Sequence, residues 1–281
     1  MIDFALVGCG RIAKRHADIL GKGHAPGARL VAVCDVVAER ARAFGEQYNV
    51  PWFTSIEELL SGSQAQVVSV LTPSGMHAEN AIEIARGGRH MVVEKPMALT
   101  LADADAMVSA CDRAGVRLFV VKQNRFNVPV VQARAALEQG CFGKLVLGTV
   151  RVRWCRPQSY YDHDSWRGTW EQDGGVLANQ ASHHVDMLQW FMGDVESVHA
   201  RGVTALARVA TEDTAVATVK FRDGALGVIE ATTATRPSDL EGSLSVLGSG
   251  GTVEVAGFAV NKIRTWQFVD PTPGDAEMLE R

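Results

Sequence analysis

The stretch FALVGCGRIA, residues 4–13, decides the fold of the first part of this chain. An apolar run typical of a buried strand leads directly into Gly8, Gly10 and Ala13, which form a GxGxxA arrangement. Gly8 permits a tight turn, Gly10 lets the backbone approach a pyrophosphate, and the small Ala13 allows a helix to pack closely on the strand. Amides at the start of that helix can bind phosphate. The stretch therefore predicts a dinucleotide-binding loop, with a plain turn as the alternative.

The second strand-like run, RLVAVCD at residues 29–35, strengthens this interpretation. It ends in Asp35, about where such units hold a ribose-binding carboxylate. A carboxylate there accepts hydrogen bonds from ribose hydroxyls and repels a 2′-phosphate. We expect NAD rather than NADP as the cofactor. Arg40, one turn further on, is the residue that would favour NADP instead. The alternative role for Asp35 is to cap a helix.

Short apolar runs alternate with helical periodicity up to about residue 122. The runs that predict strands are residues 4–8, 29–35, 66–72, 90–95 and 117–122. The amphipathic stretches between them include residues 37–48, 77–88 and 101–115. Strands alternating with helices indicate right-handed crossovers and a doubly wound parallel sheet. We predict an NAD-binding Rossmann domain over residues 1–122.

The pattern changes after a further predicted helix at residues 128–140. Strand-like segments separated by tight glycine or aspartate turns follow at residues 144–154, 213–221, 224–235, 242–248 and 251–255. One long helical stretch, residues 174–193, interrupts them. This succession predicts a largely antiparallel sheet in a second domain, residues 123–281.

Composition limits the possible partners. Lys and Arg number 28 against 32 Asp and Glu, and no basic cluster occurs, so nucleic acid and anionic membranes are poor candidates. No segment has the roughly 18 apolar residues that a membrane span needs, and the N-terminus enters a strand without a basic leader. The five cysteines are scattered, without CxxC or zinc-type spacing, which indicates reduced thiols and no metal site. We expect a soluble cytoplasmic protein.

The segment VVEKPMAL, residues 92–99, places Glu94 and Lys95 at the end of a predicted buried strand. Ligands of doubly wound sheets bind outside the carboxyl ends of the strands. Pro96 ends the strand and fixes the direction of the chain, so Lys95 can point over the crevice where a nicotinamide lies. A lysine there can bind a substrate hydroxyl or exchange a proton with it. The alternative is an ordinary solvated lysine.

A second group of polar residues lies in DGGVLANQASHHVDML, residues 173–188. On an α-helix, Asn179, His183 and Asp186 share one face, whereas His184 points about 100° away. Polar residues on an otherwise apolar helix are costly to bury without purpose. His183 is therefore a candidate catalytic residue, with a satisfied core histidine as the alternative, and His184 is assigned to structure.

Together these segments resemble the Gfo/Idh/MocA oxidoreductases. The resemblance rests on GCGRIA, TPSGMH at residues 72–77, EKP at residues 94–96 and the segment 173–186, and it runs from Met1 almost to the end. It implies a Rossmann domain joined to an α/β domain with a large, open, mostly antiparallel sheet. It also implies hydride transfer from a sugar carbon, with Lys95 and His183 as the catalytic residues.

The resemblance and the motifs together give two further sets of candidate residues. The cofactor set is Gly8, Gly10, Arg11, Ile12, Asp35, Thr72, Ser74, His77, Glu94, Lys95, Gln123, Trp166 and Arg167. The substrate set is Lys95, Arg125, Arg153, Arg156, Asn179 and His183. These three arginines and Arg167 are candidates for a carboxylate and a diphosphate, because a guanidinium presents a planar fork to such groups. A solvated surface charge is the alternative for each of the four arginines.

One departure from the family pattern narrows the expected substrate. Many sugar dehydrogenases carry aspartate four residues before the histidine, whereas this chain has Asn179, so proton removal rests on Lys95 and His183. This variant, with the segments 120–131, 151–157 and 164–175, is similar to the UDP-N-acetylglucosaminuronate 3-dehydrogenase branch of the family. That similarity implies oxidation of a UDP-linked 2-acetamido uronic acid at C3, in the synthesis of bacterial surface polysaccharide.

Other functions remain open at this point. An inositol or free-sugar dehydrogenase would share the fold and the Lys95 and His183 pair, and a non-catalytic NAD-binding sensor is a third reading. We expect a homo-oligomer, a dimer or a tetramer. The chain also stops at GDAEMLER, earlier than such enzymes usually do, so the second domain is expected to be incomplete.

Overall fold

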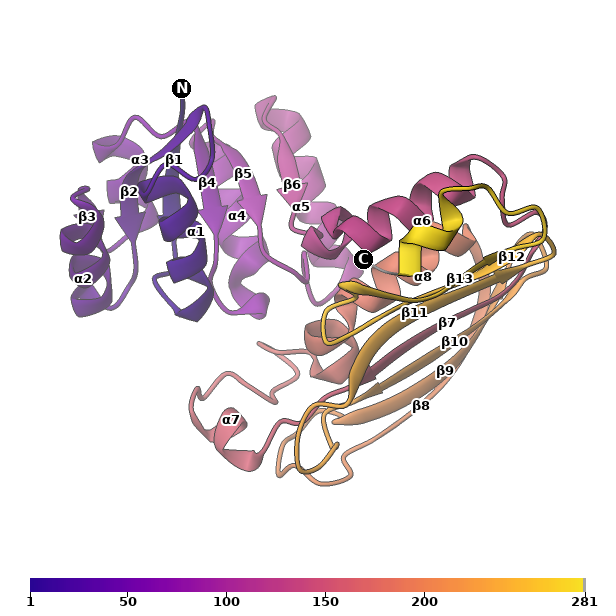
Figure 1. The fold of residues 1–281 in the computed structure, drawn as a ribbon. Helices are drawn as coiled ribbons and strands as arrows, with labels where there is room; N and C mark the ends of the chain where they lie inside the picture. The colour runs from indigo at the N-terminus through magenta and orange to yellow at the C-terminus, as the bar shows by residue number, and fades with distance from the viewer. Residues whose placement is uncertain (280–281) are drawn as a thin grey trace. The chain divides into compact units, whose positions relative to one another are not determined.

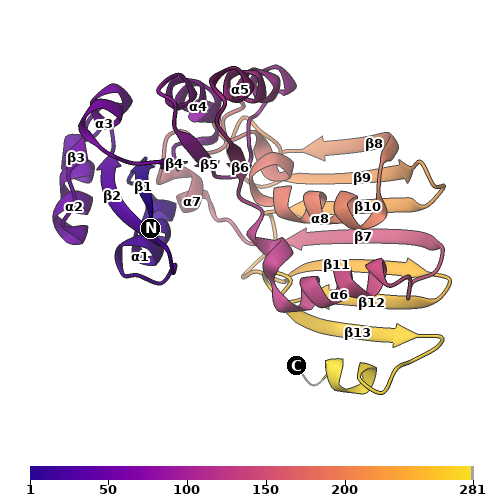
Figure 2. The ribbon, with the colours of Figure 1, turned by 90° about the horizontal axis from the view of Figure 1, so that it is seen from above.

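The chain divides into two compact units, Met1–Val121 and Lys122–Arg281. The computed structural model describes residues 1–279 of it. Figures 1 and 2 show that each unit has a sheet and helices of its own. Within the described range, no helix is long and apolar enough to cross a membrane.

The first unit is built on a six-stranded sheet with the order β3-β2-β1-β4-β5-β6. All neighbouring strands in it are parallel. The strands are β1 (Ile2–Val7), β2 (Ala28–Cys34), β3 (Trp52–Phe53), β4 (Val67–Val70), β5 (His90–Val93) and β6 (Leu118–Val120). The strand order reverses between β1 and β4, which is the point where doubly wound sheets bind their ligands. The predicted parallel Rossmann sheet is confirmed.

Helices cover both faces of this sheet, as Figure 2 shows. They are α1 (Arg11–Gly21), α2 (Ala38–Tyr48), α3 (Ile56–Gly62), α4 (His77–Arg86) and α5 (Leu101–Ala114). Leu6 of β1 packs in one core with Ala13 of α1, whereas its neighbours Ala5 and Val7 pack in another with Met107 of α5. Because successive strand residues point to opposite faces, a strand buried on both sides must be apolar throughout.

The second unit contains a seven-stranded sheet with the order β13-β12-β11-β7-β10-β9-β8. Its strands are β7 (Leu145–Arg153), β8 (Val195–Val203), β9 (Thr214–Phe221), β10 (Leu226–Thr232), β11 (Glu241–Gly248), β12 (Gly251–Ala256) and β13 (Lys262–Phe268). All neighbouring pairs are antiparallel except β7 with β10, which is parallel. The predicted mostly antiparallel sheet is confirmed.

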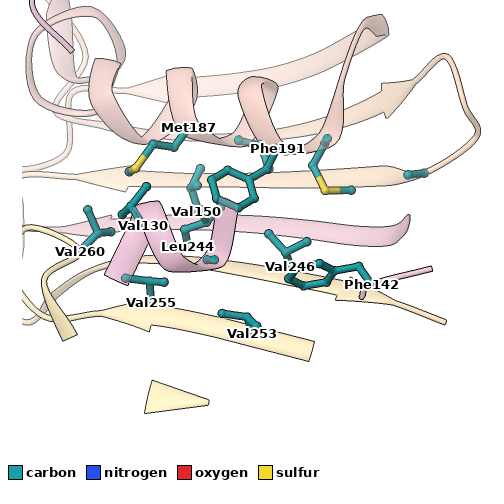
Figure 3. Close-up of a cluster of buried hydrophobic side chains, with 14 of the residues drawn as sticks. Val130, Phe142, Val150, Met187, Phe191, Leu244, Val246, Val253, Val255 and Val260 are labelled. Carbon is teal, nitrogen blue, oxygen red and sulfur yellow. The ribbon is translucent and has the colours of Figure 1, made fainter. Parts of the chain in front are cut away.

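Helices α6 (Val128–Glu138) and α8 (Ser182–Met192) lie on one face of this sheet. Figure 3 shows Val130 and Met187 of these helices in one cluster with Val150 and Leu244 of the strands, all fully buried. At Gly148, an added Cβ would lie 2.7 Å from the Leu188 Cδ1 atom, so glycine lets α8 approach β7 closely. Among the described residues, no helix lies on the other face of the sheet in Figure 1.

Several elements escaped the sequence analysis. Strands β8 and β13, the two-residue β3 and helix α3 were not predicted, and neither was α7 (Gln158–Asp162). Short helical turns also occur: η1 (Ser74–Met76), η2 (Gln123–Phe126) and η4 (Asp275–Leu279). All nine residues of β8 are exposed, so it shows none of the apolar alternation that reveals a strand.

The helical stretch 174–193 is not one α-helix, so that prediction is wrong in its geometry. A π-helical turn, η3 (Val176–Gln180), comes first and α8 begins after it. The amide of Ala181 bonds to the carbonyl of Val176, five residues back, which inserts one residue into the helical repeat. Asn179 therefore lies in the π-helical turn, whereas His183 and Asp186 lie in the α-helix, and the predicted α-helical spacing does not extend to Asn179.

Candidate functional site

The glycine loop after β1 has the geometry that a dinucleotide requires. Gly8 has a φ of +96°, and a Cβ there would lie 2.8 Å from the carbonyl carbon of Leu71. At Gly10, by contrast, an added Cβ would meet no atom of the described residues within 4 Å. Helix α1 begins after Gly10 with no side-chain cap and no acidic residue in its first turn, within the described chain. Its exposed amides and dipole favour an anion such as a pyrophosphate, so these residues fit the group.

Asp35 directly follows β2 and holds this loop in place. Its Oδ2 accepts a hydrogen bond from the amide of Cys9 at 2.8 Å, and its Oδ1 accepts one from the amide of Val37 at 2.8 Å. The residue at the N-cap of α2 is Val37, so Asp35 does not occupy the capping position considered for it. Each carboxylate oxygen has a second lone pair, which suits a ribose diol.

The segment 72–77 joins two loops at this edge of the sheet. The His77 side chain, 1% exposed, has Nδ1 2.8 Å from the carbonyl oxygen of Pro96 and Nε2 3.0 Å from that of Thr72. Burial lowers the pKa of His77, although both carbonyls oppose the change. Asn80 donates to the Thr72 hydroxyl at 2.9 Å, and Ser74 is buried beside it in η1. His77 thus ties the loop after β4 to the turn after β5.

Glu94 and Lys95 follow β5, and Glu94 is anchored to α1. Its Oε1 lies 3.0 Å from Nε2 of His16, and its Oε2 accepts from the Lys95 amide at 3.2 Å. Burial raises the pKa of Glu94, but the bond and charge of His16 and the contacts of Lys95 outweigh it, so the pKa is lowered. The glutamate is therefore ionised at neutral pH.

The carboxyl ends of parallel strands meet at one edge of a sheet. Gly8, Asp35, Thr72 and Glu94 directly follow β1, β2, β4 and β5, so the structure brings the predicted cofactor residues of the first unit to one edge. Arg11 and Ile12, also predicted, are exposed in the first turn of α1 at the same edge.

In the second unit, η2 is bound to α8 through polar side chains. Nε2 of Gln123 lies 3.0 Å from Nε2 of His183, which is 7% exposed. Arg125 forms two bonds with Asp186, at 2.7 and 2.8 Å, and Lys122 lies 3.4 Å from the same carboxylate. The structure therefore brings together the predicted residues Gln123, Arg125 and His183.

The neighbouring His184 has a different environment. It is fully buried, and its ring lies edge-on to Trp154 with the centroids 5.8 Å apart. Burial lowers its pKa to about 4, and neither ring nitrogen has a hydrogen-bond partner among the described residues. This agrees with the assignment of His184 to structure.

A hydrogen-bonded cluster surrounds Asn179. The Nδ2 atom of Asn179 donates to the buried Asp173, and its Oδ1 accepts from Gln180 at 3.1 Å. The Oε1 atom of Gln180 accepts from Nε of Arg156 at 3.2 Å, and its Nε2 donates to the Tyr160 hydroxyl at 3.0 Å. Asn179 and Arg156, both predicted substrate residues, are thus linked.

Arg167 joins this cluster through Tyr160. Its guanidinium donates to the Tyr160 hydroxyl and to Asp164, the latter at 2.9 Å. It also lies 4.4 Å from the ring centroid of Trp166, so the two predicted cofactor residues are stacked on each other. The cluster therefore holds Asn179, Arg156, Arg167 and Trp166 in one region.

Arg153 does not join them. Val152 is buried in a core with Val185 of α8, so the adjacent Arg153 points to the opposite face of the sheet. There it forms two bonds with Glu230, at 2.5 and 2.7 Å, and lies 3.3 Å from Glu241. The structure therefore separates Arg153 from the residues around α8.

The polar residues of these clusters that escaped the sequence analysis include His16, Tyr160, Asp173 and Gln180. Asp173 and Gln180 lie within the quoted segment 173–188, but only their contacts reveal a role. The sequence could have indicated His16 as a residue near the cofactor site, because it lies on the helix that follows the glycine loop.

Two family models match consecutive parts of the chain. The oxidoreductase family with an NAD-binding Rossmann fold matches residues 2–122, and the GFO/IDH/MocA C-terminal domain matches residues 130–254. Among solved structures, the WlbA dehydrogenase from Bordetella pertussis, in complex with NADH and UDP-GlcNAcA, is 48% identical. The match has a TM-score of 0.95 and covers 99% of this chain and 83% of that one.

Two curated relatives of lower identity are dehydrogenases. D-apiose dehydrogenase from Paraburkholderia graminis is 30% identical over 83% of this chain, and myo-inositol 2-dehydrogenase from Thermotoga maritima is 31% identical over 80%. The matched regions span only 60% and 66% of the lengths of these two enzymes. Both units nevertheless match models of one family, and the chain belongs to the Gfo/Idh/MocA oxidoreductases, with an NAD-binding Rossmann domain as its first unit.

Proposed function

We propose that the chain carries an NAD-dependent dehydrogenase that oxidises a UDP-linked 2-acetamido uronic acid at C3. The observation that carries the proposal is the match, at 48% identity over 99% of the chain, to a dehydrogenase crystallised with NADH and UDP-GlcNAcA. The residues at the carboxyl edge of the first sheet and around α8 provide the groups that this reaction needs.

The cofactor, when bound, supplies the hydride acceptor. Gly8 and Gly10 admit its pyrophosphate at the start of α1, and Asp35 accepts hydrogen bonds from a ribose diol. The Asp35 carboxylate also repels a 2′-phosphate, which favours NAD over NADP. Thr72, Ser74, Glu94 and Lys95 are proposed to border the nicotinamide end.

Lys95 and His183 are the proposed proton acceptors for the substrate hydroxyl. The side-chain nitrogen of Gln123 can only donate, so the Nε2 atom of His183 accepts in their contact. A neutral ring in this arrangement carries its proton on Nδ1 and keeps a lone pair on Nε2. Gln123 thus holds His183 in the form that can take up a proton, and general-base help of this kind typically contributes about 10²–10⁴ in rate.

Arg156 is the proposed principal partner of the substrate's carboxylate. Its Nε donates to Gln180, and its Nη1 donates to Asp239 and to the Cys155 carbonyl. Its Nη2 donates to no described residue. A guanidinium fork with one side available suits a carboxylate. Arg125 and Arg167 are proposed for the remaining anionic groups, and Trp166 for a ring face.

The biological setting is proposed on the same resemblance. A C3-oxidised UDP-uronic acid suits the synthesis of bacterial surface polysaccharide, and we propose a cytoplasmic homo-oligomer as the working form. The matched regions span 60% of D-apiose dehydrogenase and 66% of myo-inositol 2-dehydrogenase, so the activity of the whole protein is part of this proposal.

NADH formation across a substrate panel tests the proposal. The panel is UDP-N-acetylglucosaminuronate, UDP-N-acetylglucosamine and myo-inositol, with a downstream aminotransferase and its amino donor added so that the 3-keto product is removed. Strong preference for the uronate supports the proposal. The second candidate, an inositol or free-sugar dehydrogenase, is favoured by the 31% identity to myo-inositol 2-dehydrogenase, and turnover of inositol without turnover of the uronate would select it.

A further inference from the structure

A chain of hydrogen bonds runs from a buried carboxylate to an arginine in the second unit. Asp173, 5% exposed, accepts from Nδ2 of Asn179, and Oδ1 of Asn179 accepts from Nε2 of Gln180 at 3.1 Å. Oε1 of Gln180 then accepts from Nε of Arg156 at 3.2 Å. Two side-chain amides thus stand head to tail between an anion and a cation.

The two ends of this chain fix the direction of both amides. A carboxylate can only accept hydrogen bonds and a guanidinium can only donate them. If either amide turned over, an oxygen would face the Asp173 carboxylate or an NH₂ group would face Arg156. Asp173 is itself held by the amide of Gly168, which donates to its other oxygen, Oδ2, at 2.9 Å.

The position of the charge distinguishes this chain from the family pattern in which residue 179 is an aspartate. Here residue 179 is an amide, and the carboxylate stands one hydrogen bond behind it, at Asp173. The negative charge therefore stands at residue 173 rather than at residue 179. Hydrogen bonds in such a chain polarise one another, so the charge of Asp173 is felt at Gln180.

We propose that Asp173 is a positioning residue for substrate recognition, which acts through the amides of Asn179 and Gln180 to hold Arg156 for the substrate's carboxylate. This inference rests on the proposed function, because it assigns Arg156 to the uronate. Asp173 touches neither the substrate nor the cofactor in this role. Its charge sets which atom of each amide faces the ligand and how Arg156 is oriented.

The first variant is Asp173→Asn, which keeps the shape and removes the charge. We expect the dissociation constant of UDP-N-acetylglucosaminuronate to rise about tenfold, since a charged hydrogen-bond partner is lost. The dissociation constants of UDP-N-acetylglucosamine, which lacks the carboxylate, and of NAD should change less than about twofold, because neither uses Arg156 in this proposal. Calorimetric titration of the three ligands into the full protein measures this.

The double variant Asp173→Asn/Asn179→Asp moves the charge to residue 179. The new asparagine can offer its oxygen to the Gly168 amide and its NH₂ to the new carboxylate, which accepts from Gln180 as before. We expect the preference for the uronate to return to within about threefold of the unmodified protein, because the direction of the chain is restored. Asn179→Asp alone places two carboxylates in contact, and its uronate affinity should fall as the pH rises.

A matched control is Asp213→Asn. Asp213 is as deeply buried, at 1% exposed, but its carboxylate binds the amides of Ala205, Leu206 and Ala207 and does not join the chain. This variant should leave unchanged the ratio of the affinities for UDP-N-acetylglucosaminuronate and UDP-N-acetylglucosamine. Thermal unfolding of every variant establishes that the fold is retained.

A second readout requires no substrate. In protein labelled with ¹⁵N at Asn and Gln, one side-chain NH₂ proton of Asn179 should resonate downfield because it donates to a carboxylate, and it should move upfield in Asp173→Asn. Unchanged Asn179 and Gln180 signals, or a uronate affinity within twofold of the unmodified protein, would overturn the inference. If these signals behave as expected but the unmodified protein does not bind the uronate, the proposed substrate fails and the amide chain stands.

Discussion

Nε2 of His16 lies 3.0 Å from Oε1 of Glu94, so the helix that follows the glycine loop contacts the glutamate that precedes Lys95. The pair joins the two segments that are proposed to hold the pyrophosphate and the nicotinamide. It lowers the pKa of a carboxylate that burial alone would raise. The contact therefore contributes to stability as well as to the position of Lys95.

Replacing His16 by alanine should raise the pKa of Glu94 and destabilise the first unit. A carboxyl with a lowered pKa stabilises the fold above its ordinary pKa, near 4.5 here, and this contribution is lost as the pH falls through the folded-state value. We expect the free energy of unfolding to fall by about 1–3 kcal/mol at pH 7. The difference from the unmodified protein should shrink at acid pH. Urea unfolding at pH 7 and near pH 3.5 measures both values, and an equal loss at the two pH values would contradict the assignment.

Asp35→Ala should narrow the preference for NAD over NADP. The unmodified protein should bind NAD at least about tenfold more tightly, because a carboxylate placed to bind the ribose diol repels a 2′-phosphate. Fluorescence titration with both cofactors measures the ratio. Equal affinities in the unmodified protein would refute the role of Asp35. Since Asp35 also accepts from the Cys9 amide, the variant's thermal stability should be recorded in parallel.

Gly8→Ala and Gly10→Ala form a matched pair. A Cβ at Gly8 meets the Leu71 carbonyl carbon at 2.8 Å and requires a positive φ, so we expect the fold to lose about 1–3 kcal/mol of stability. Among the described residues, a Cβ at Gly10 meets no atom within 4 Å, so that variant should keep its stability and lose NAD affinity instead. Comparing melting temperatures with NAD titrations separates the two effects. Unchanged NAD binding in Gly10→Ala would place the pyrophosphate elsewhere.

Lys95→Ala and His183→Ala should each slow hydride transfer far more than they weaken NAD binding. Their proposed contacts matter mainly in the transition state, so the single-turnover rate should fall by about 10²-fold or more. Asn179→Ala should instead raise the dissociation constant of the substrate, because an amide cannot take up the proton. A His183→Ala rate within twofold of the unmodified enzyme would show that this histidine is structural.

His184 should make the free energy of unfolding depend on pH between the ordinary histidine pKa and the pKa of His184 in the folded protein. A buried histidine whose pKa is lowered from 6.5 to about 4 binds fewer protons than the unfolded chain in that range, so stability is lost as the pH falls. The loss from pH 7 to pH 4 should approach about 3 kcal/mol. His184→Leu should remove most of this dependence, which denaturant unfolding across the range would reveal. An unchanged pH profile would show that another group titrates.

The sequence predicted the first unit well because its signals are local. GCGRIA and the alternation of apolar runs with amphipathic stretches define a parallel sheet without reference to distant residues. Strand β8 was missed because all of its residues are exposed, which leaves no periodic pattern. The π-helical turn at Val176–Gln180 was missed because a single inserted residue is a property of the backbone and not of the apolar pattern.

Some residues of the candidate site could likewise be placed from the sequence, and others could not. Gly8, Asp35 and Lys95 could be placed from the rule that ligands bind beyond the carboxyl ends of strands. The positions of the arginines could not, since each pairs with an acidic residue that is remote in the chain or invisible as a motif. Arg153 illustrates this. Its partner Glu230 lies 77 residues away in the chain, and Arg153 lies on the face of the sheet opposite α8.

The parallel pairing of β7 with β10 has a consequence for how the second unit folds. Strand β7 ends at Arg153, but its two neighbours in the sheet, β10 and β11, begin at Leu226 and Glu241. Both pairings of β7 therefore require a long intervening segment to close, which makes folding slow compared with units of local contacts. During synthesis the first unit can fold as it emerges, whereas β7 must wait, with both edges open, until most of the remaining chain has left the ribosome.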